Sequence, residues 1–204
     1  MERLINELLR ESVLKNPLVL SAFKAIDRAD FVPKEKTREA YQNYPLSIGY
    51  GQTISQPYTV AFMMELLDPK PEQKILEVGS GSGWQTAMLA YIVEEKGKVY
   101  AMEIIPELSE FGKANVAKYP DLAKRVTFSA HSAENGLPKH APFDRIIAAA
   151  SLREIPDAWK IQLKIGGKMV FPLRESIYVL TKESSEKFKK EVFHGFVFVP
   201  FVKK

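Results

Sequence analysis

A glycine- and serine-rich turn behind a short apolar stretch is the part of this chain best suited to bind a small molecule. Ile75, Leu76 and Val78 suit a buried parallel strand, and residues 79–83 follow it as Gly-Ser-Gly-Ser-Gly. A helical pattern of apolar residues then covers residues 85–93. Glycines between a strand and a helix permit a tight turn and let a ligand approach the backbone closely. The sequence therefore predicts half of a nucleotide-binding βαβ unit.

The glycine spacing and one acidic residue narrow the choice of ligand. A dinucleotide fingerprint needs G-x-G-x-x-G, but the third glycine, Gly83, comes one residue too early, which disfavours a dehydrogenase. Glu77 precedes Gly79 by two residues, and the resulting E-x-G-x-G-x-G resembles motif I of the class I S-adenosylmethionine (AdoMet) methyltransferases. AdoMet carries a sulfonium cation and no phosphate, so a carboxylate near this turn is electrostatically favourable. A glycine turn without a ligand is the alternative.

The elements that must hold this turn are predicted by alternating strand and helix patterns between residues 74 and 171. Such alternation is typical of a doubly wound, mostly parallel α/β sheet, whose ligands lie at the carboxyl ends of the strands. We therefore expect Glu103, at the end of the second strand, to accept hydrogen bonds from both hydroxyls of a ribose. A solvated acid at a strand end is the alternative. Further strands are expected at residues 98–102, 126–130, 143–149 and 168–171, and helices at 59–67, 106–118 and 155–163, the last capped by Gly166 and Gly167.

The flanking segments are expected to complete a single domain of 204 residues. Residues 1–58 would supply two helices (1–15 and 17–27) and a substrate loop (41–57), and residues 59–173 the cofactor-binding core. Residues 174–204 would add C-terminal strands at 177–181 and 191–199, including an antiparallel one. The loop at 41–57 is poor in charge and rich in aromatic residues, which favours a functional loop over a disordered one.

Composition limits the class of protein further. The chain has no cysteine, and its histidines, His131, His140 and His194, lack the spacing of metal ligands, so no metal site is expected. We assign His131 and His140 to ordinary surface or loop positions. The formal net charge is only +4 and no basic cluster is evident, which argues against a nucleic-acid partner. No stretch has the pattern of a signal peptide or a membrane span, so we expect a cytoplasmic protein without membrane contact.

Several longer stretches resemble one family over nearly the whole chain. They occur in the order typical of the protein-L-isoaspartate O-methyltransferases, which methylate the free α-carboxyl of L-isoaspartyl residues in damaged proteins and peptides. The ester then closes to a succinimide, and repair begins. The resemblance implies a Rossmann-like class I methyltransferase fold, AdoMet as cofactor, S-adenosyl-L-homocysteine as product, and a monomer. The stretches are RADFVP (28–33), AYQNYPL (40–46), PLSIG (45–49), GQTISQP (51–57), APFDRII (141–147), QLKIGGKMVFP (162–172) and FVPF (198–201).

The same resemblance implies roles for individual residues. Ser55 matches the family's active-site serine and would orient the substrate carboxylate, while Thr53 would line the cofactor side. A carboxylate with a pKa of about 4 is already ionised at neutral pH, so no strong base is required. The alternative is that Ser55 caps a helix beginning near Pro57. The implied cofactor contacts are Thr53, Glu77, Gly79, Ser80, Gly81, Gly83, Glu103, Ser132 and Ala133, and the implied substrate contacts are Ile54, Ser55, Ala150, Val197 and Val199.

The resemblance is incomplete at four places near the expected cleft. Without the family's aspartate after the third strand, either adenine recognition is weaker, with one hydrogen bond accepted by Ser132, or Glu134 substitutes for the aspartate. Arg153 becomes a candidate clamp for a substrate carboxylate, although a solvated arginine is the simpler interpretation. The departures are His131-Ser132-Ala133 for Gly-Asp-Gly, Ala-Ala-Ala-Ser-Leu at 148–152 for Val-Thr-Ala-Ala-Pro, Val197 for Arg, and Ser47 for Pro.

Two rival functions follow from these departures. One is a diverged class I methyltransferase acting on another substrate, such as RNA or a small molecule. It would predict a basic stripe or a different loop in place of residues 51–57, and the sequence has neither. The other is a non-catalytic AdoMet-binding protein, which would bind the cofactor without methylating an isoaspartyl peptide.

Overall fold

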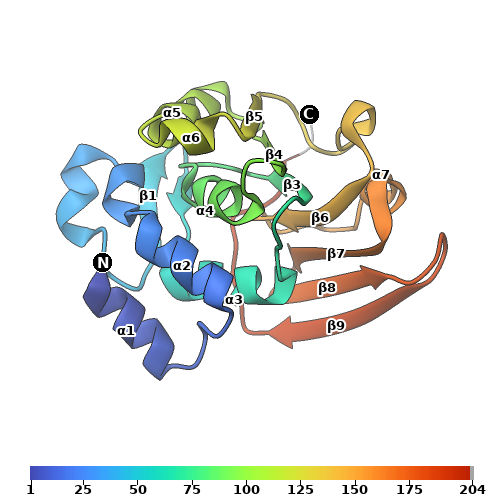
Figure 1. Ribbon diagram of the computed structural model, residues 1–204, viewed down its shortest axis with the longest axis horizontal. Coiled ribbons are helices and arrows are strands. Elements are labelled where there is room, and N and C mark those ends of the chain that lie inside the picture. The colour runs from blue at the N-terminus through green and yellow to red at the C-terminus, as the bar shows by residue number, and fades with distance from the viewer. Residues whose placement is uncertain (203–204) are drawn as a thin grey trace.

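A seven-stranded sheet forms the centre of the computed structural model, which describes residues 1–202 (Figure 1). Its strand order is β5-β4-β3-β6-β7-β8-β9, with parallel pairing from β5 to β7 and antiparallel pairing from β7 to β9. This confirms the predicted doubly wound, mostly parallel sheet with antiparallel C-terminal strands. The strands are β3 (Lys74–Val78), β4 (Lys98–Met102), β5 (Val126–Ser129), β6 (Phe143–Ala148), β7 (Leu163–Leu173), β8 (Ser176–Lys182) and β9 (Phe188–His194).

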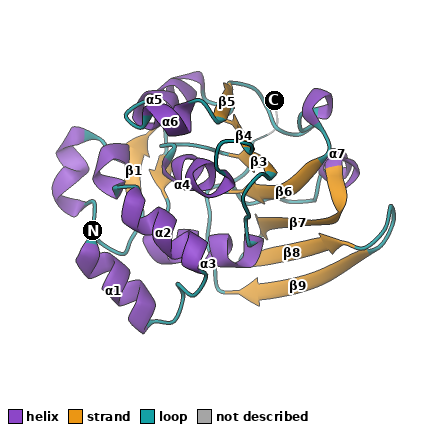
Figure 2. Ribbon diagram, in the orientation of Figure 1, coloured by secondary structure: helices purple, strands orange, loops and turns teal. Residues whose placement is uncertain are grey.

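Helices flank this sheet, and proline at the first or second helical position marks where several of them begin (Figure 2). Proline suits the start of a helix because its fixed φ is helical and its missing N–H has no partner there anyway. At the second helix the Asn16 side chain also accepts a hydrogen bond from the Leu18 N–H at 2.9 Å. The helices are α1 (Glu2–Arg10), α2 (Pro17–Ala25), α3 (Pro57–Leu67), α4 (Trp84–Val93), α5 (Pro106–Val116), α6 (Pro120–Ala123) and α7 (Asp157–Gln162). Short 3-10 helices cover Arg28–Phe31, Lys34–Glu39 and Pro138–His140.

The central strands are apolar on both faces because each face carries its own hydrophobic core. Ile75 belongs to the core shared with α1–α5, whereas its neighbour Leu76 belongs to the core that contains Trp159 of α7. The same alternation separates Ile147 from Ile146 on β6. Successive side chains of a strand point to opposite faces, so a strand covered on both sides is apolar throughout. No helix within residues 1–202 is long and apolar enough to cross a bilayer.

Three local predictions are corrected by the structure. The loop predicted at 41–57 contains a hairpin of β1 (Leu46–Gly49) and β2 (Gln52–Ile54), which turns through positive φ at residues 49–51. Gly166 and Gly167 do not cap α7, which ends at Gln162; they lie inside β7. The strand predicted at 191–199 already ends at His194, because Gly195 turns the chain with φ +90°. The hairpin of β8 and β9 extends to the side of the molecule opposite α1 and α2 (Figure 1).

Gly83 allows the start of α4 to lie directly against α5. A Cβ at this position would lie 2.7 Å from the carbonyl oxygen of Gly112 in α5. Its φ of +83° also strains any residue with a side chain. Gly83 is therefore required for helix packing beneath the glycine turn.

We predict that Gly83→Ala lowers the free energy of unfolding by about 1–3 kcal/mol more than Gly166→Ala does. Gly166 has a similar φ of +79° but open space around its Cα, so the matched substitution carries backbone strain without a clash. Urea denaturation of the two variants and the parent protein measures the difference. Equal losses in the two variants would contradict the proposed close contact.

Candidate functional site

A cavity of about 890 Å³ lies at the carboxyl ends of β3 and β4. Four parts of the chain enclose it: the glycine turn with residues 102–107, the β1–β2 hairpin with residues up to Val60, residues 197–202, and the loops after β5 and β6 with residues 131, 133, 149 and 150. Its position agrees with the rule that ligands of open α/β sheets bind at the carboxyl ends of the strands. Its volume lies within the range of about 300–1,000 Å³ that is typical of ligand pockets.

The glycine turn is held in place by the neighbouring strand β4. The Gly79 N–H donates to the Met102 carbonyl at 2.8 Å, and the Gly81 N–H donates to Glu103 Oε2 at 3.0 Å. The other carboxylate oxygen, Oε1, accepts from the Ile105 N–H at 3.1 Å. Each carboxylate oxygen accepts more than one hydrogen bond. Glu103 therefore holds both the glycine turn and the segment after β4 in place, and its oxygens can still accept hydrogen bonds from a ligand in the cavity.

Glu77 is a buried carboxyl at the wall of the cavity. The Thr86 hydroxyl donates to one of its oxygens at 2.5 Å and the Gln85 amide to the other at 3.0 Å. Burial raises the pKa of Glu77 to about 7, against the opposing effect of these two donors. A cation in the cavity would favour the ionised form of this group.

Ser80 lines the cavity and carries an unused hydrogen-bonding group. Its side chain is buried, and its Oγ has no hydrogen-bond partner among residues 1–202. A buried hydroxyl without a partner is costly unless a ligand or water satisfies it. The unmet hydrogen bond of Ser80 is therefore compatible with a ligand or a water bound at the glycine turn.

Ser55 follows β2 and lines the same cavity. Its carbonyl accepts a hydrogen bond from Arg28 Nη2 at 3.0 Å. The N-cap of α3 is Gln56, and no side-chain hydrogen bond caps that helix. The interpretation of Ser55 as a helix cap therefore has no support in this geometry, which leaves the hydroxyl available to the cavity.

Residues 197–202 form the third wall by pairing with the segment after β6. The Ser151 N–H donates to the Val199 carbonyl at 2.7 Å, and the Phe201 N–H donates back to the Ser151 carbonyl at 2.8 Å. The Phe201 ring meets the edge of Trp159 with 6.0 Å between centroids. Val197, by contrast, is 87% exposed at the rim of the cavity.

The cavity brings together most of the site residues that the sequence predicts. Gly83 and Ser132 are the two that do not line it, and neither do the candidates Glu134 and Arg153. His131, assigned above to an ordinary surface or loop position, does line the cavity. It follows the carboxyl end of β5, so the strand-end rule was the signal that could have identified it. The predicted residues that line the cavity are Thr53, Ile54, Ser55, Glu77, Gly79, Ser80, Gly81, Glu103, Ala133, Ala150, Val197 and Val199.

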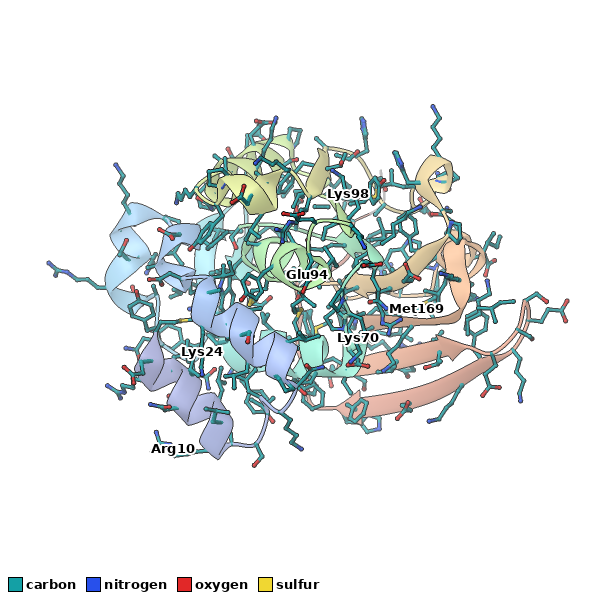
Figure 3. All side chains as sticks on the ribbon, viewed as in Figure 1. Arg10, Lys24, Lys70, Glu94, Lys98 and Met169 are labelled. Carbon is teal, nitrogen blue, oxygen red and sulfur yellow. The ribbon has the colours of Figure 1, made fainter. Side chains whose placement is uncertain are left out.

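The charge of the cavity distinguishes between classes of ligand. Glu77, Glu103 and Glu107 line it, and within the described part of the chain no lysine or arginine does. Basic side chains such as Arg10, Lys24 and Lys70 instead lie on separate elements of the outer surface (Figure 3). A phosphate-bearing ligand would call for cations, whereas a sulfonium or ammonium ligand suits carboxylates.

The sheet, the glycine turn at β3, the acid at the end of β4 and the acidic cavity together define a class I AdoMet-dependent methyltransferase. Comparison with known sequences identifies the family. The model of the protein-L-isoaspartate(D-aspartate) O-methyltransferase family matches residues 1–204, and the chain belongs to that family.

Individual relatives agree over nearly their full lengths. The chain is 41% identical to the protein-L-isoaspartate O-methyltransferase of Hyperthermus butylicus, covering 98% of this chain and 87% of that one. It is 40% identical to that of Pyrobaculum islandicum, with 97% of each covered. Its fold matches a Plasmodium falciparum protein, assigned to the same activity and solved with S-adenosyl-L-homocysteine, at a TM-score of 0.89 and 24% identity, covering 99% and 98%.

We predict that Glu77→Gln flattens the dependence of stability on pH between about pH 5 and pH 7. In this window the folded parent keeps a proton on Glu77 that the unfolded chain has lost, since the pKa is raised from 4.5 to about 7. The parent's free energy of unfolding therefore falls as pH rises, by up to about 3 kcal/mol from this group. Glutamine has a similar shape and does not titrate.

Urea denaturation of both proteins at pH 5, 6 and 7 without ligand measures this effect. The other titrating groups are common to the two proteins, so their difference isolates Glu77. Parallel curves over this range would contradict a raised pKa.

Proposed function

We propose that this protein transfers the methyl group of AdoMet to the free α-carboxyl of L-isoaspartyl residues in damaged proteins and peptides. The methyl ester then closes to a succinimide, which begins repair. The observation that carries the proposal is that the glycine turn and Ser55 line one cavity, in a chain that belongs to the isoaspartyl methyltransferase family. Relatives at about 40% identity are named protein-L-isoaspartate O-methyltransferase.

The residues of the cavity fit AdoMet. Ser80 offers an unsatisfied hydroxyl, Glu103 retains acceptor capacity that would suit ribose hydroxyls, and Glu77 supplies a carboxyl at the cavity wall that would suit a cationic ligand. When bound, AdoMet supplies an electrophilic methyl group on sulfur. The structural relative from Plasmodium falciparum is described as a complex with S-adenosyl-L-homocysteine, the product that remains after methyl transfer.

The remaining chemistry requires positioning rather than a base. An isoaspartyl carboxylate is ionised at neutral pH and is itself the nucleophile. We assign the Ser55 O–H to donate a hydrogen bond to one carboxylate oxygen, which orients the other toward the methyl group. Residues 50–56 and 197–202 flank this position and would exclude water around the reacting groups. Ile54, Ala150, Val197 and Val199 would contact the rest of the peptide.

No observation favours the rival functions. The predicted monomeric state, cytoplasmic location and lack of a nucleic-acid partner stay predictions. Sedimentation, cell fractionation and a nucleic-acid binding assay respectively would test them. Titration calorimetry with AdoMet and with NAD would distinguish the proposed cofactor from a dinucleotide.

We predict that methyl label from AdoMet appears on an isoaspartyl peptide in base-labile form and is absent from the matched aspartyl peptide.

Ser55→Ala should lower kcat/KM for the isoaspartyl peptide roughly ten- to hundredfold, because it removes one hydrogen bond to a charged group. Its affinity for AdoMet should stay close to that of the parent protein. Ser80→Ala should instead weaken the binding of AdoMet, measured by calorimetry.

Ser184→Ala, in the exposed turn between β8 and β9, is the control and should leave both quantities unchanged. Full turnover by Ser55→Ala would remove that residue from the mechanism. AdoMet binding without label on either peptide would contradict the proposed substrate. It would favour a non-catalytic AdoMet-binding protein or a methyltransferase that acts on another substrate.

A further inference from the structure

Arg28 is a fully buried cation without an acidic partner. Its exposed fraction is 0%, and across residues 1–202 no carboxylate forms an ion pair with it. Burial lowers the pKa of its guanidinium to about 10, which leaves it charged at neutral pH. Buried charges in proteins are normally paired, so this arginine calls for an explanation.

The guanidinium is surrounded by carbonyl oxygens from both limbs of the β1–β2 hairpin. Nη1 donates to the carbonyl oxygens of Ala40 at 2.8 Å and Gln42 at 3.4 Å. Nη2 donates to those of Tyr44 at 3.3 Å and Ser55 at 3.0 Å. The first three residues precede β1 and the last follows β2, so one side chain joins the two ends of the hairpin at its base.

Trp84 fixes the orientation of this guanidinium from one face. The Arg28 Cζ lies 5.3 Å from the centroid of the indole ring, and the indole N–H donates to the Ile26 carbonyl at 3.4 Å. Arg28 Nε is buried and has no hydrogen-bond partner among residues 1–202, so the contacts of the guanidinium are those of its two terminal nitrogens and of the indole ring. Trp84 also lines the cavity, so the arginine lies between the cavity wall and the hairpin.

We propose that Arg28 is a positioning residue for methyl transfer, which sets the backbone of Ser55 by closing the base of residues 40–55. The inference rests on the proposed function of Ser55 and extends it to a residue outside the cavity lining. Arg28 would act through the Ser55 carbonyl rather than by touching substrate or cofactor. Its two terminal nitrogens carry four N–H groups for these four carbonyls, whereas a single ammonium group has three donors.

Two substitutions and one matched control test this role. Arg28→Met keeps an apolar stem and removes every donor, whereas Arg28→Lys keeps the charge with fewer and differently directed donors. Arg145→Met is the control, because Arg145 also donates to backbone carbonyls (Leu67 at 2.8 Å and Asp144 at 2.9 Å), but these carbonyls belong to residues that do not line the cavity. All kinetics are measured at a temperature where circular dichroism shows each protein folded.

For Arg28→Met we expect kcat/KM for the isoaspartyl peptide to fall roughly ten- to hundredfold, with AdoMet affinity within about twofold of the parent protein. For Arg28→Lys we expect a kcat/KM between that of Arg28→Met and that of the parent protein. Arg145→Met should lose stability but keep the parent's kcat/KM. Parent-like kcat/KM in folded Arg28→Met, or an equal loss in Arg145→Met, would overturn the proposal.

Hydrogen exchange gives a second readout that does not depend on turnover. In Arg28→Lys we expect faster amide exchange confined to residues 40–56, and unchanged exchange in α5 and β4. Uniformly faster exchange, or none, would overturn the positioning role. If Arg28→Met does not fold, Arg28→Lys and Arg28→Gln carry the same kinetic and exchange tests, and parent-like values in both would overturn it.

The two proposals fail in different ways. If the parent protein does not label the isoaspartyl peptide, the proposed function is wrong, while the exchange pattern still reports whether Arg28 holds the hairpin. If the parent is active and Arg28→Lys and Arg28→Met match it in kcat/KM, only the role of Arg28 is wrong.

Discussion

The hydrogen bond between the Gly81 N–H and the Glu103 carboxylate joins the ends of two neighbouring parallel strands. Parallel pairing brings the carboxyl ends of β3 and β4 to the same edge, so the turn after one strand meets the acid after the other. The turn then runs into α4, whose first residues pack against α5 only because Gly83 lacks a side chain. The side of the cavity next to the glycine turn is therefore formed by the central strands β3 and β4 and by the start of α4.

The sheet was predictable because its signals are local. An apolar run followed by a glycine turn and a helical period identifies β3 and α4 without reference to the rest of the chain. The β1–β2 hairpin was missed because its strands have only four and three residues, too few to establish an alternation. Gly166 and Gly167 were misassigned because a glycine pair is equally compatible with a helix cap and a strand that approaches its neighbour closely; a Cβ at Gly167 would lie 3.0 Å from the Asp144 carbonyl.

The site was predictable where one motif holds its residues and less so where distant segments meet. The resemblance pointed to residues of the glycine turn and the hairpin, and most of them line one cavity. His131 follows the carboxyl end of β5, which the strand-end rule places at the cavity, but which side chain after that strand lines the cavity depends on the path of the loop. The setting of Arg28 was equally hidden, since its four carbonyl partners lie between 12 and 27 residues away. No pattern in the sequence records a contact between one side chain and backbone atoms at such separations.

The cavity has walls of two kinds, and this division affects how the enzyme family can diversify. The wall beside the glycine turn is made by buried central strands, where a substitution disturbs the core. The opposite walls come from the hairpin and from residues 197–202, where Tyr50 and Val197 are 61% and 87% exposed. Substitutions in the hairpin and in residues 197–202 would therefore change the shape of the cavity entrance at little cost in folding free energy, whereas substitutions beside the glycine turn would disturb the core.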